Sequence, residues 1–163
     1  MNDLLCTAII GAGATAVLDL WVVVRKRLFG VPPPDYGLVG RWLAHIALNG
    51  RFRHDRISAA AAVRGERMVG WAAHYVTGIA FAALLVGTWG SAWIRQPMLG
   101  PALLVGVCTS AAPFLLMQPG MGAGVAASRT PRPGAARLQT LVTHTIFGLG
   151  LYIAGQAIRV VIA

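Results

Sequence analysis

Long apolar runs alternate with short polar segments along the whole chain. Four runs, at residues 4–24, 70–93, 98–118 and 138–161, contain few charged residues. A helix of about 20 residues, rising about 1.5 Å per residue, is long enough to cross roughly 30 Å of hydrocarbon. The pattern therefore predicts an all-α membrane protein. Its four transmembrane helices are expected to form an up-down bundle, as a single transmembrane domain over residues 1–163.

The polar segment between the first two runs has a pattern of its own. After Pro32–Pro34, the stretch at residues 37–50 places apolar side chains on one helical face and polar side chains on another. The apolar face comprises Leu38, Trp42, Leu43 and Ile46, and the polar face comprises Arg41, His45 and Asn49. We predict a short interfacial amphipathic helix in the first cytoplasmic loop, with its basic side toward the lipid headgroups.

The distribution of charge predicts the orientation. The chain has 14 Lys and Arg against 5 Asp and Glu, a net charge of +9. Most of the basic residues lie in residues 25–69 and 119–137, so both segments are expected in the cytoplasm. This predicts a multi-pass protein of the bacterial inner membrane with both termini in the periplasm. Nucleic acid is not an expected partner, because the arginines form no basic face interleaved with aromatic residues.

An arginine-rich segment, RFRHDR, follows the predicted interfacial helix at residues 51–56. Basic clusters at a membrane surface bind the phosphates of anionic lipids. We therefore expect membrane lipids as partners. The predicted lipid or anion contacts are Arg41, Arg51, Arg53, His54, Asp55 and Arg129. The alternative is an ordinary positively charged cytoplasmic loop that has no ligand.

Four polar side chains lie at a similar depth inside the predicted spans, namely Asp19, His74, Gln118 and His144. Counted along the helices, they fall within roughly 10 Å of one level in the inner leaflet. A carboxylate in hydrocarbon costs at least about 2.5 kcal/mol on insertion scales, so Asp19 is expected to have a partner, most naturally a histidine. Such a cluster suits a proton or ion pathway, a divalent metal held by Asp19, His74 and His144, haem b between two histidines, or helix packing alone.

The end of the third run is rich in glycine and proline. Pro113 is expected to bend its helix, and Pro119-Gly120 to stop it within the inner leaflet. The turn formed by Pro119, Gly120, Met121 and Gly122 is predicted to line the same polar pocket. Free amides of Gly120, Gly122 and Gly124, together with Ser128 and Arg129, would bind an anion such as a lipid headgroup. The alternative is a flexible cytoplasmic connection.

Several stretches resemble a bacterial membrane family, the domain of unknown function 2938. They are GAGATAVLDLW, VGRWLAHIALNGRFRHD, GERMVGWAAHYVTGIAFA, APFLLMQPGMGAGVAASRTPRP and HTIFGLGLY. The resemblance covers nearly the whole chain. It implies a small polytopic inner-membrane protein with no assigned activity and supplies no catalytic residues.

The residues favour a proton- or ion-linked transporter or channel component built on the Asp/His cluster. Four spans are few for a transporter, so a homo-oligomer or a partner membrane subunit is expected. One alternative is a haem-binding, metal-binding or structural subunit of a membrane complex, and another is a lipid-headgroup-binding protein. An enzyme is not expected, because the sequence contains no phosphatase, phosphotransferase or GxSG-type protease signature.

Overall fold

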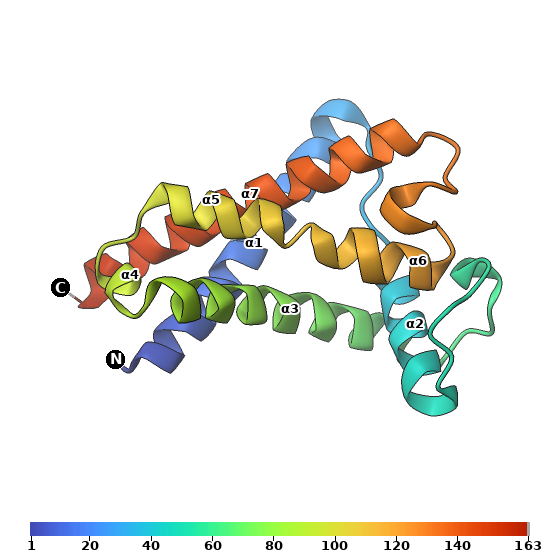
Figure 1. Cartoon of the computed structure of the whole chain (residues 1–163), viewed down its shortest axis with the longest axis horizontal. Helices are drawn as coiled ribbons and strands as arrows, with labels where there is room; N and C mark the ends of the chain where they lie inside the picture. The colour runs from blue at the N-terminus through green and yellow to red at the C-terminus, as the bar shows by residue number, and fades with distance from the viewer. Residues whose placement is uncertain (163) are drawn as a thin grey trace. The chain divides into compact units, whose positions relative to one another are not determined.

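The chain has an all-helical fold. The computed structural model describes residues 1–162, and this part of the chain contains helices and connections but no strand. Four helices are long and apolar enough to cross a membrane: α1 (Asp3–Phe29), α3 (Glu66–Trp89), the helix Leu99–Met121 and α7 (Pro133–Ile162) (Figure 1). Each overlaps one of the four apolar runs, so the predicted number and order of membrane-length helices are confirmed.

Glycine in the left-handed region ends two of these helices. α1 continues beyond the predicted residue 24 and stops at Gly30, where φ is 65°. α3 ends at Trp89, before the predicted end at residue 93, because Gly90 has a φ of 74°. A Cβ disfavours this conformation, so glycine is the usual residue at such helix ends. The short helix α4 (Ala92–Arg95) follows.

The third membrane-length helix departs from a regular α-helix. It consists of α5 (Leu99–Cys108), a π-helical turn η2 (Pro113–Met117) and α6 (Gln118–Met121). Proline lacks a backbone donor and crowds the preceding turn, which explains the π-turn that begins at Pro113. The predicted stop at Pro119-Gly120 is too early, since the helix continues to Met121 and ends at Gly122, where φ is 99°.

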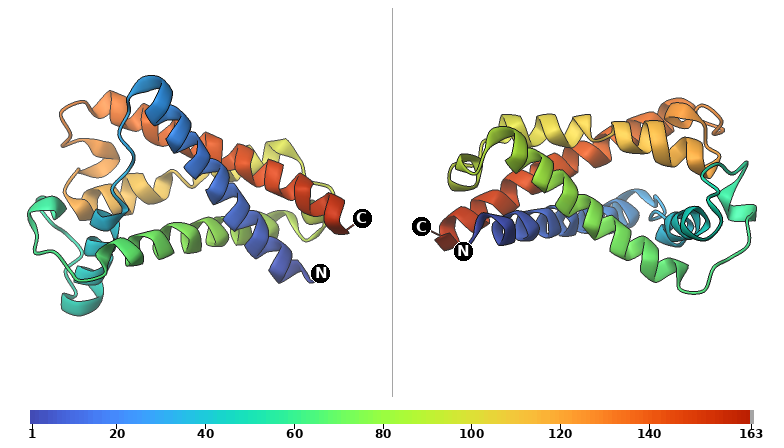
Figure 2. Two further views of the ribbon diagram at one scale, coloured as in Figure 1. Left: turned by 180° about the vertical axis from the view of Figure 1, so that it is seen from behind. Right: turned by 60° about the horizontal axis from the view of Figure 1, so that its bottom comes forward.

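The described residues form two compact units. The first contains residues 1–33, 75–109 and 142–162. Buried residues of its core include Ile10, Leu85, Trp93 and Leu151. Its helices approach closely at glycines: a Cβ on Gly106 would lie 2.6 Å from the Cα of Gly148 in α7. Figure 2 shows α1 crossing α3, where a Cβ on Gly11 would overlap the backbone of Ile79. Such small-residue contacts are typical of helices that pack in membranes.

The second unit contains residues 34–74 and 110–141. Its elements are α2 (Tyr36–Asn49), the 3-10 turns η1 (Ile57–Ala59) and η3 (Val125–Ala127), η2, α6, and the adjoining turns of α3 and α7. Asp35 caps the start of α2 by accepting a hydrogen bond from the Gly37 amide at 2.9 Å. Gly50, with a φ of 63°, ends this helix.

The helix predicted in the first loop is present as α2, but its expected orientation needs correction. His45, predicted on the outward polar face, is only 8% exposed. Arg41, from the same predicted face, binds Glu66. By contrast, Leu48 near the end of the helix is 71% exposed. The partners of Arg41 and His45, Glu66 and His54 among them, lie outside the helix and cannot be identified from its period.

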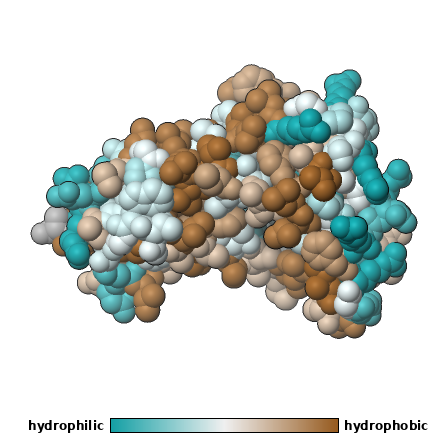
Figure 3. Space-filling model, viewed as in Figure 1, coloured by the Kyte–Doolittle hydropathy of each residue, from teal (hydrophilic) through white to brown (hydrophobic). Residues whose placement is uncertain are grey.

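Large apolar side chains are exposed along all the membrane-length helices. Leu20, Val76, Leu104 and Val160 are 64%, 64%, 53% and 77% exposed. Figure 3 shows many such hydrophobic residues, in brown, on the face that it displays. Water-soluble proteins rarely expose so much contiguous apolar surface. The exposure therefore agrees with helices whose outer surface contacts lipid.

Candidate functional site

A cavity of about 470 Å³ lies in the second unit. Two segments that are far apart in the sequence form its walls, one after α2 and the other from the start of α6 to beyond η3. The lining residues are Arg51, Arg53, His54, Asp55, Pro119, Gly124, Val125, Ser128 and Arg129. The structure thus brings together, around one cavity, the two segments for which the sequence predicted anion contacts separately.

A backbone hydrogen bond joins the two walls. The amide of His54 donates to the carbonyl of Gly120 at 2.9 Å. Gly120 also lies against the indole of Trp42, where a Cβ would come 2.6 Å from Nε1. At Gly122, a Cβ would overlap the carbonyl of Asp55. The glycines of this turn therefore permit the close approach of residues 51–55.

The predicted turn contributes to the site in more than one way. The amide of Gly122 donates to the Pro119 carbonyl at 3.3 Å, so it is not a free donor. Met121 is the last residue of α6. Of the predicted turn, Pro119 lines the cavity, while Gly120 and Gly122 lie against the opposite wall. The lining side chains are the charged ligands that the cavity offers to an anion.

The turn after α6 has strained backbone beside the cavity. Ala126 and Ala127 have φ values of 47° and 58°, a region that costs a residue with a Cβ about 1–3 kcal/mol. Two hydrogen bonds hold the turn: the Arg129 amide donates to the Ala123 carbonyl at 2.8 Å, and Arg137 donates to the Ala126 carbonyl at 2.8 Å. Strain of this kind concentrates at ligand sites and switches.

The positive charge of the cavity is not neutralised by an ion pair. Arg51, Arg53 and Arg129 are exposed, and within residues 1–162 none of the three forms a salt bridge. Asp55 supplies the single carboxylate of the lining, so three guanidinium groups leave a net charge of +2 when His54 is neutral. Guanidinium groups bind planar or tetrahedral oxyanions through paired hydrogen bonds. An oxyanion is therefore the ligand that these side chains suit.

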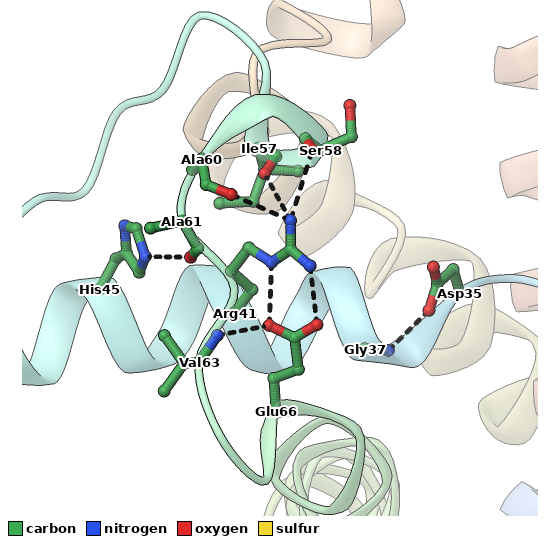
Figure 4. A network of polar contacts seen from close by, with 10 residues as sticks. All are labelled: Asp35, Gly37, Arg41, His45, Ile57, Ser58, Ala60, Ala61, Val63 and Glu66. Atoms are coloured by element: carbon green, nitrogen blue, oxygen red, sulfur yellow. Dashed lines mark hydrogen bonds and ion pairs between the residues drawn. The ribbon is translucent and has the colours of Figure 1, made fainter.

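Arg41, a predicted lipid contact, has protein partners. Its Nε lies 2.8 Å from Oε2 of Glu66, and its Nη2 lies 2.7 Å from Oε1. Its Nη1 donates to the carbonyls of Ser58 and Ala60 at 3.3 and 3.1 Å (Figure 4). Hydrogen bonding to Glu66 raises the pKa of Arg41 above its ordinary value. This network ties α2 to the start of α3 and holds the segment that follows the cavity wall.

His54 is the buried ionisable residue of the lining, with 5% of its surface exposed. Its Nε2 lies 3.0 Å from Nδ1 of His45, whose Nε2 lies 3.0 Å from the carbonyl of Ala61. Nδ1 of His54 is buried and has no protein partner within the described part of the chain. The sequence does not predict this pair. Its one signal is the turn at Asn49-Gly50, which folds the following segment back along α2.

Two members of the predicted intramembrane cluster lie in the first unit. Oδ2 of Asp19 accepts a hydrogen bond from the hydroxyl of Tyr75 at 2.9 Å. Nδ1 of His144 lies 3.1 Å from the hydroxyl of Thr109. The sequence pattern predicts neither hydroxyl as a partner, although Tyr75 directly follows His74. Hydroxyl groups supply the hydrogen bonds that these two buried or half-buried side chains require.

The other two members lie in the second unit. Nε2 of His74 lies 3.1 Å from the hydroxyl of Tyr36, and the two rings stack with centroids 4.3 Å apart. Nε2 of Gln118 donates to the hydroxyl of Thr140 at 3.2 Å. The Tyr36 ring thus covers one face of His74, and its hydroxyl contacts Nε2, a nitrogen through which histidine can bind the iron of haem b.

The structure also bears on the predicted metal ligands. Within residues 1–162, no group of three His, Cys, Asp or Glu side chains is arranged to hold a metal ion. Among the predicted site residues, the set that the structure assembles around one cavity is the arginine-rich one.

Comparison with known proteins agrees with the resemblance in the sequence. The family model described as "Protein of unknown function (DUF2938)" matches residues 8–158. No curated protein and no solved structure matches the chain. Any function must therefore be inferred from the residues of the cavity and the spans.

Proposed function

We infer the function of this chain from its site, because it belongs to the DUF2938 family, whose description names no activity. We propose that it is a polytopic protein of the bacterial inner membrane that binds the phosphate of an anionic lipid headgroup. The ligand lies in the cavity between residues 51–55 and 119–129. The observation that carries the proposal is the convergence on one cavity of Arg51, Arg53 and Arg129, which form no ion pair with any residue from 1 to 162.

The proposed topology puts this cavity at the cytoplasmic surface. Four helices have the length and composition of membrane spans. The two segments that line the cavity, 51–55 and 119–129, belong to the two connections that hold most of the basic residues. Basic connections remain in the cytoplasm. An up-down order of the spans then leaves both termini in the periplasm and exposes the cavity to the anionic inner leaflet.

The end of α2 supports a position near the lipid surface. Leu48 is 71% exposed, and Phe52, in the next turn of chain, is 38% exposed. Phe52 directly separates Arg51 from Arg53 in the sequence. In the proposal, these two apolar side chains enter the headgroup region while the neighbouring arginines bind phosphate.

Native mass spectrometry of the purified chain in an uncharged detergent tests the proposal. We expect the wild type to retain phosphatidic acid or phosphatidylglycerol in preference to phosphatidylcholine. In Arg53→Gln and Arg129→Gln, loss of one charge-assisted contact, worth about 1.5 kcal/mol or more, should reduce the retention about tenfold. The size of the effect should decrease at high ionic strength, because the arginines are exposed.

Arg56→Gln is the matched control, since Arg56 is exposed in the same segment and does not line the cavity. Its removal changes the net charge by the same amount. Equal losses in Arg56→Gln and Arg53→Gln would show that the loop attracts anionic lipid only through its total charge. Equal retention of charged and uncharged lipid by the wild type would reject the proposal.

A second candidate function is proton- or ion-linked transport, as part of a homo-oligomer or with a partner subunit. It is favoured by Asp19, a carboxylate within the apolar helix α1 that accepts a hydrogen bond from Tyr75. Ionisable groups inside membrane spans commonly serve ion pathways. Liposomes containing the wild type should show a pH-dependent flux that Asp19→Asn abolishes, and the absence of flux under any gradient would exclude this candidate.

A further inference from the structure

The buried pair His45–His54 has only one hydrogen-bonding pattern when both rings are neutral. A backbone carbonyl can only accept a hydrogen bond, so Nε2 of His45, 3.0 Å from the Ala61 carbonyl, must carry hydrogen. Nδ1 of His45 is then an acceptor. The bond of 3.0 Å between the rings requires hydrogen on Nε2 of His54. Nδ1 of His54 is left as a lone pair, which repels an anion.

One added proton reverses this property, whichever ring carries the charge. Nε2 of His45 keeps its hydrogen for Ala61, and one hydrogen lies in the bond between Nδ1 of His45 and Nε2 of His54. The third hydrogen of the singly charged pair must therefore lie on Nδ1 of His54. This atom is buried and has no protein partner within residues 1–162, and its residue lines the cavity. In the charged pair it is a donor that no protein group within residues 1–162 accepts, on a residue of the cavity wall.

Charged groups on several elements act on the pair. Arg51, Arg53 and Asp55 lie on the segment of His54 itself, and Arg129 faces the same cavity from beyond η3. α6 contributes backbone there, through Gly120 and Pro119. Glu66, at the start of α3, interacts with His45 by charge and is itself paired with Arg41. The three arginines disfavour a further positive charge in the empty cavity, whereas an oxyanion among them offsets that repulsion.

We propose that the cavity binds a tetrahedral oxyanion of the phosphate class together with one proton, which the His45–His54 pair takes up. This inference rests on the proposed function and adds the control of its site by pH. By linkage, the bound state holds one more proton than the free state, so affinity rises as pH falls. Between the pH at which the free pair loses this proton and the higher pH at which the bound pair loses it, affinity should decrease about tenfold for each pH unit.

Isothermal titration calorimetry of the full chain in uncharged detergent measures this coupling directly. Sulfate is the probe, because it does not itself titrate between about pH 6 and pH 8, the range in which histidine usually does. Titrations in buffers of different ionisation enthalpy give the number of protons taken up. We expect about one proton per sulfate at the alkaline end of the range and weaker binding there.

His54→Asn isolates the role of Nδ1, since its amide places a permanent donor near that position. It should bind sulfate with little dependence on pH, whereas Arg56→Gln should keep the dependence of the wild type. Proton uptake is measured on the wild type as well, so the proposal is tested even if His54→Asn fails to fold. Sulfate binding without proton uptake would overturn the coupling and leave the proposed function intact, whereas absence of binding of any anion would overturn both.

Competition distinguishes the two sources of a phosphate group. Vesicles of phosphatidylcholine with phosphatidic acid are compared with inorganic phosphate in solution. Displacement of retained phosphatidic acid by inorganic phosphate at one fixed pH supports a lipid headgroup as the ligand. Binding of inorganic phosphate without lipid retention supports a free anion as the ligand. The phosphodiester of phosphatidylglycerol does not titrate in the histidine range, so equal retention of this lipid across that range would contradict the proposal.

Discussion

Arginine residues in this protein differ in whether their charge already has a partner. Arg41 binds both oxygens of Glu66 and three backbone carbonyls. Arg53 and Arg129, in contrast, are exposed beside a cavity and form no ion pair within the described residues. Sequence alone placed all three in one class of lipid contacts. The difference could not be read from their spacing, because Glu66 lies 25 residues after Arg41.

Arg41→Lys tests the structural role of the first arginine. Lysine keeps the charge but lacks the planar fork that contacts Glu66 and the carbonyls of Ser58 and Ala60 together. We expect the segment at residues 57–61 to become several-fold more sensitive to limited proteolysis, with anionic lipid retention reduced far less than in Arg53→Gln. Unchanged proteolysis would contradict the structural role. Lipid retention as low as in Arg53→Gln would show that Arg41 also binds the lipid.

The hydrophobic pattern predicts the helices of this chain but not their ends or the contacts between elements. The four spans follow from apolar runs because their length is set by the bilayer. Their ends do not, since they depend on single glycines such as Gly30 and Gly90. The cavity depends on a contact between elements, the hydrogen bond from His54 to Gly120. No local pattern encodes such a pairing, although the arginine-rich loop and the glycine-rich turn were each recognisable as anion contacts.

Gly122→Ala should disrupt this contact between elements. The substitution introduces a Cβ at a φ of 99° and against the Asp55 carbonyl, so we expect a loss of about 1–3 kcal/mol in the free energy of unfolding and weaker anion binding. Gly134→Ala is the matched control, because Gly134 in α7 has open space at the Cβ position. Thermal unfolding and sulfate titration measure the two effects. Equal behaviour of the two variants would refute the positioning role of Gly122.

The whole molecule combines apolar helices with a basic cavity, and its orientation decides which leaflet that cavity meets. The proposed cytoplasmic position of the cavity rests on the basic connections. Charge counting predicts this orientation from the sequence. It could not predict the cavity, because the same arginines would give the same orientation even if they did not line one cavity.

Thiol labelling in intact cells tests the orientation. Cys6 and Cys108 are first replaced, and single cysteines are then introduced as Ser58→Cys in the first basic connection or Met98→Cys between the second and third spans. Both sites are exposed. A membrane-impermeant maleimide should label Met98→Cys in intact cells and Ser58→Cys only after lysis. The reverse pattern would place the cavity in the periplasm.

Photo-crosslinking with a lipid tests the central claim most directly, because it locates the bound headgroup. A phosphatidic acid analogue with a photoreactive group beside its phosphate is bound to the full chain in phosphatidylcholine vesicles, and the labelled peptides are sequenced by mass spectrometry. We predict labels in residues 51–56 and 119–129, reduced by excess inorganic phosphate and by Arg129→Gln. Labels confined to other basic stretches, such as residues 25–27, would contradict a phosphate site in this cavity.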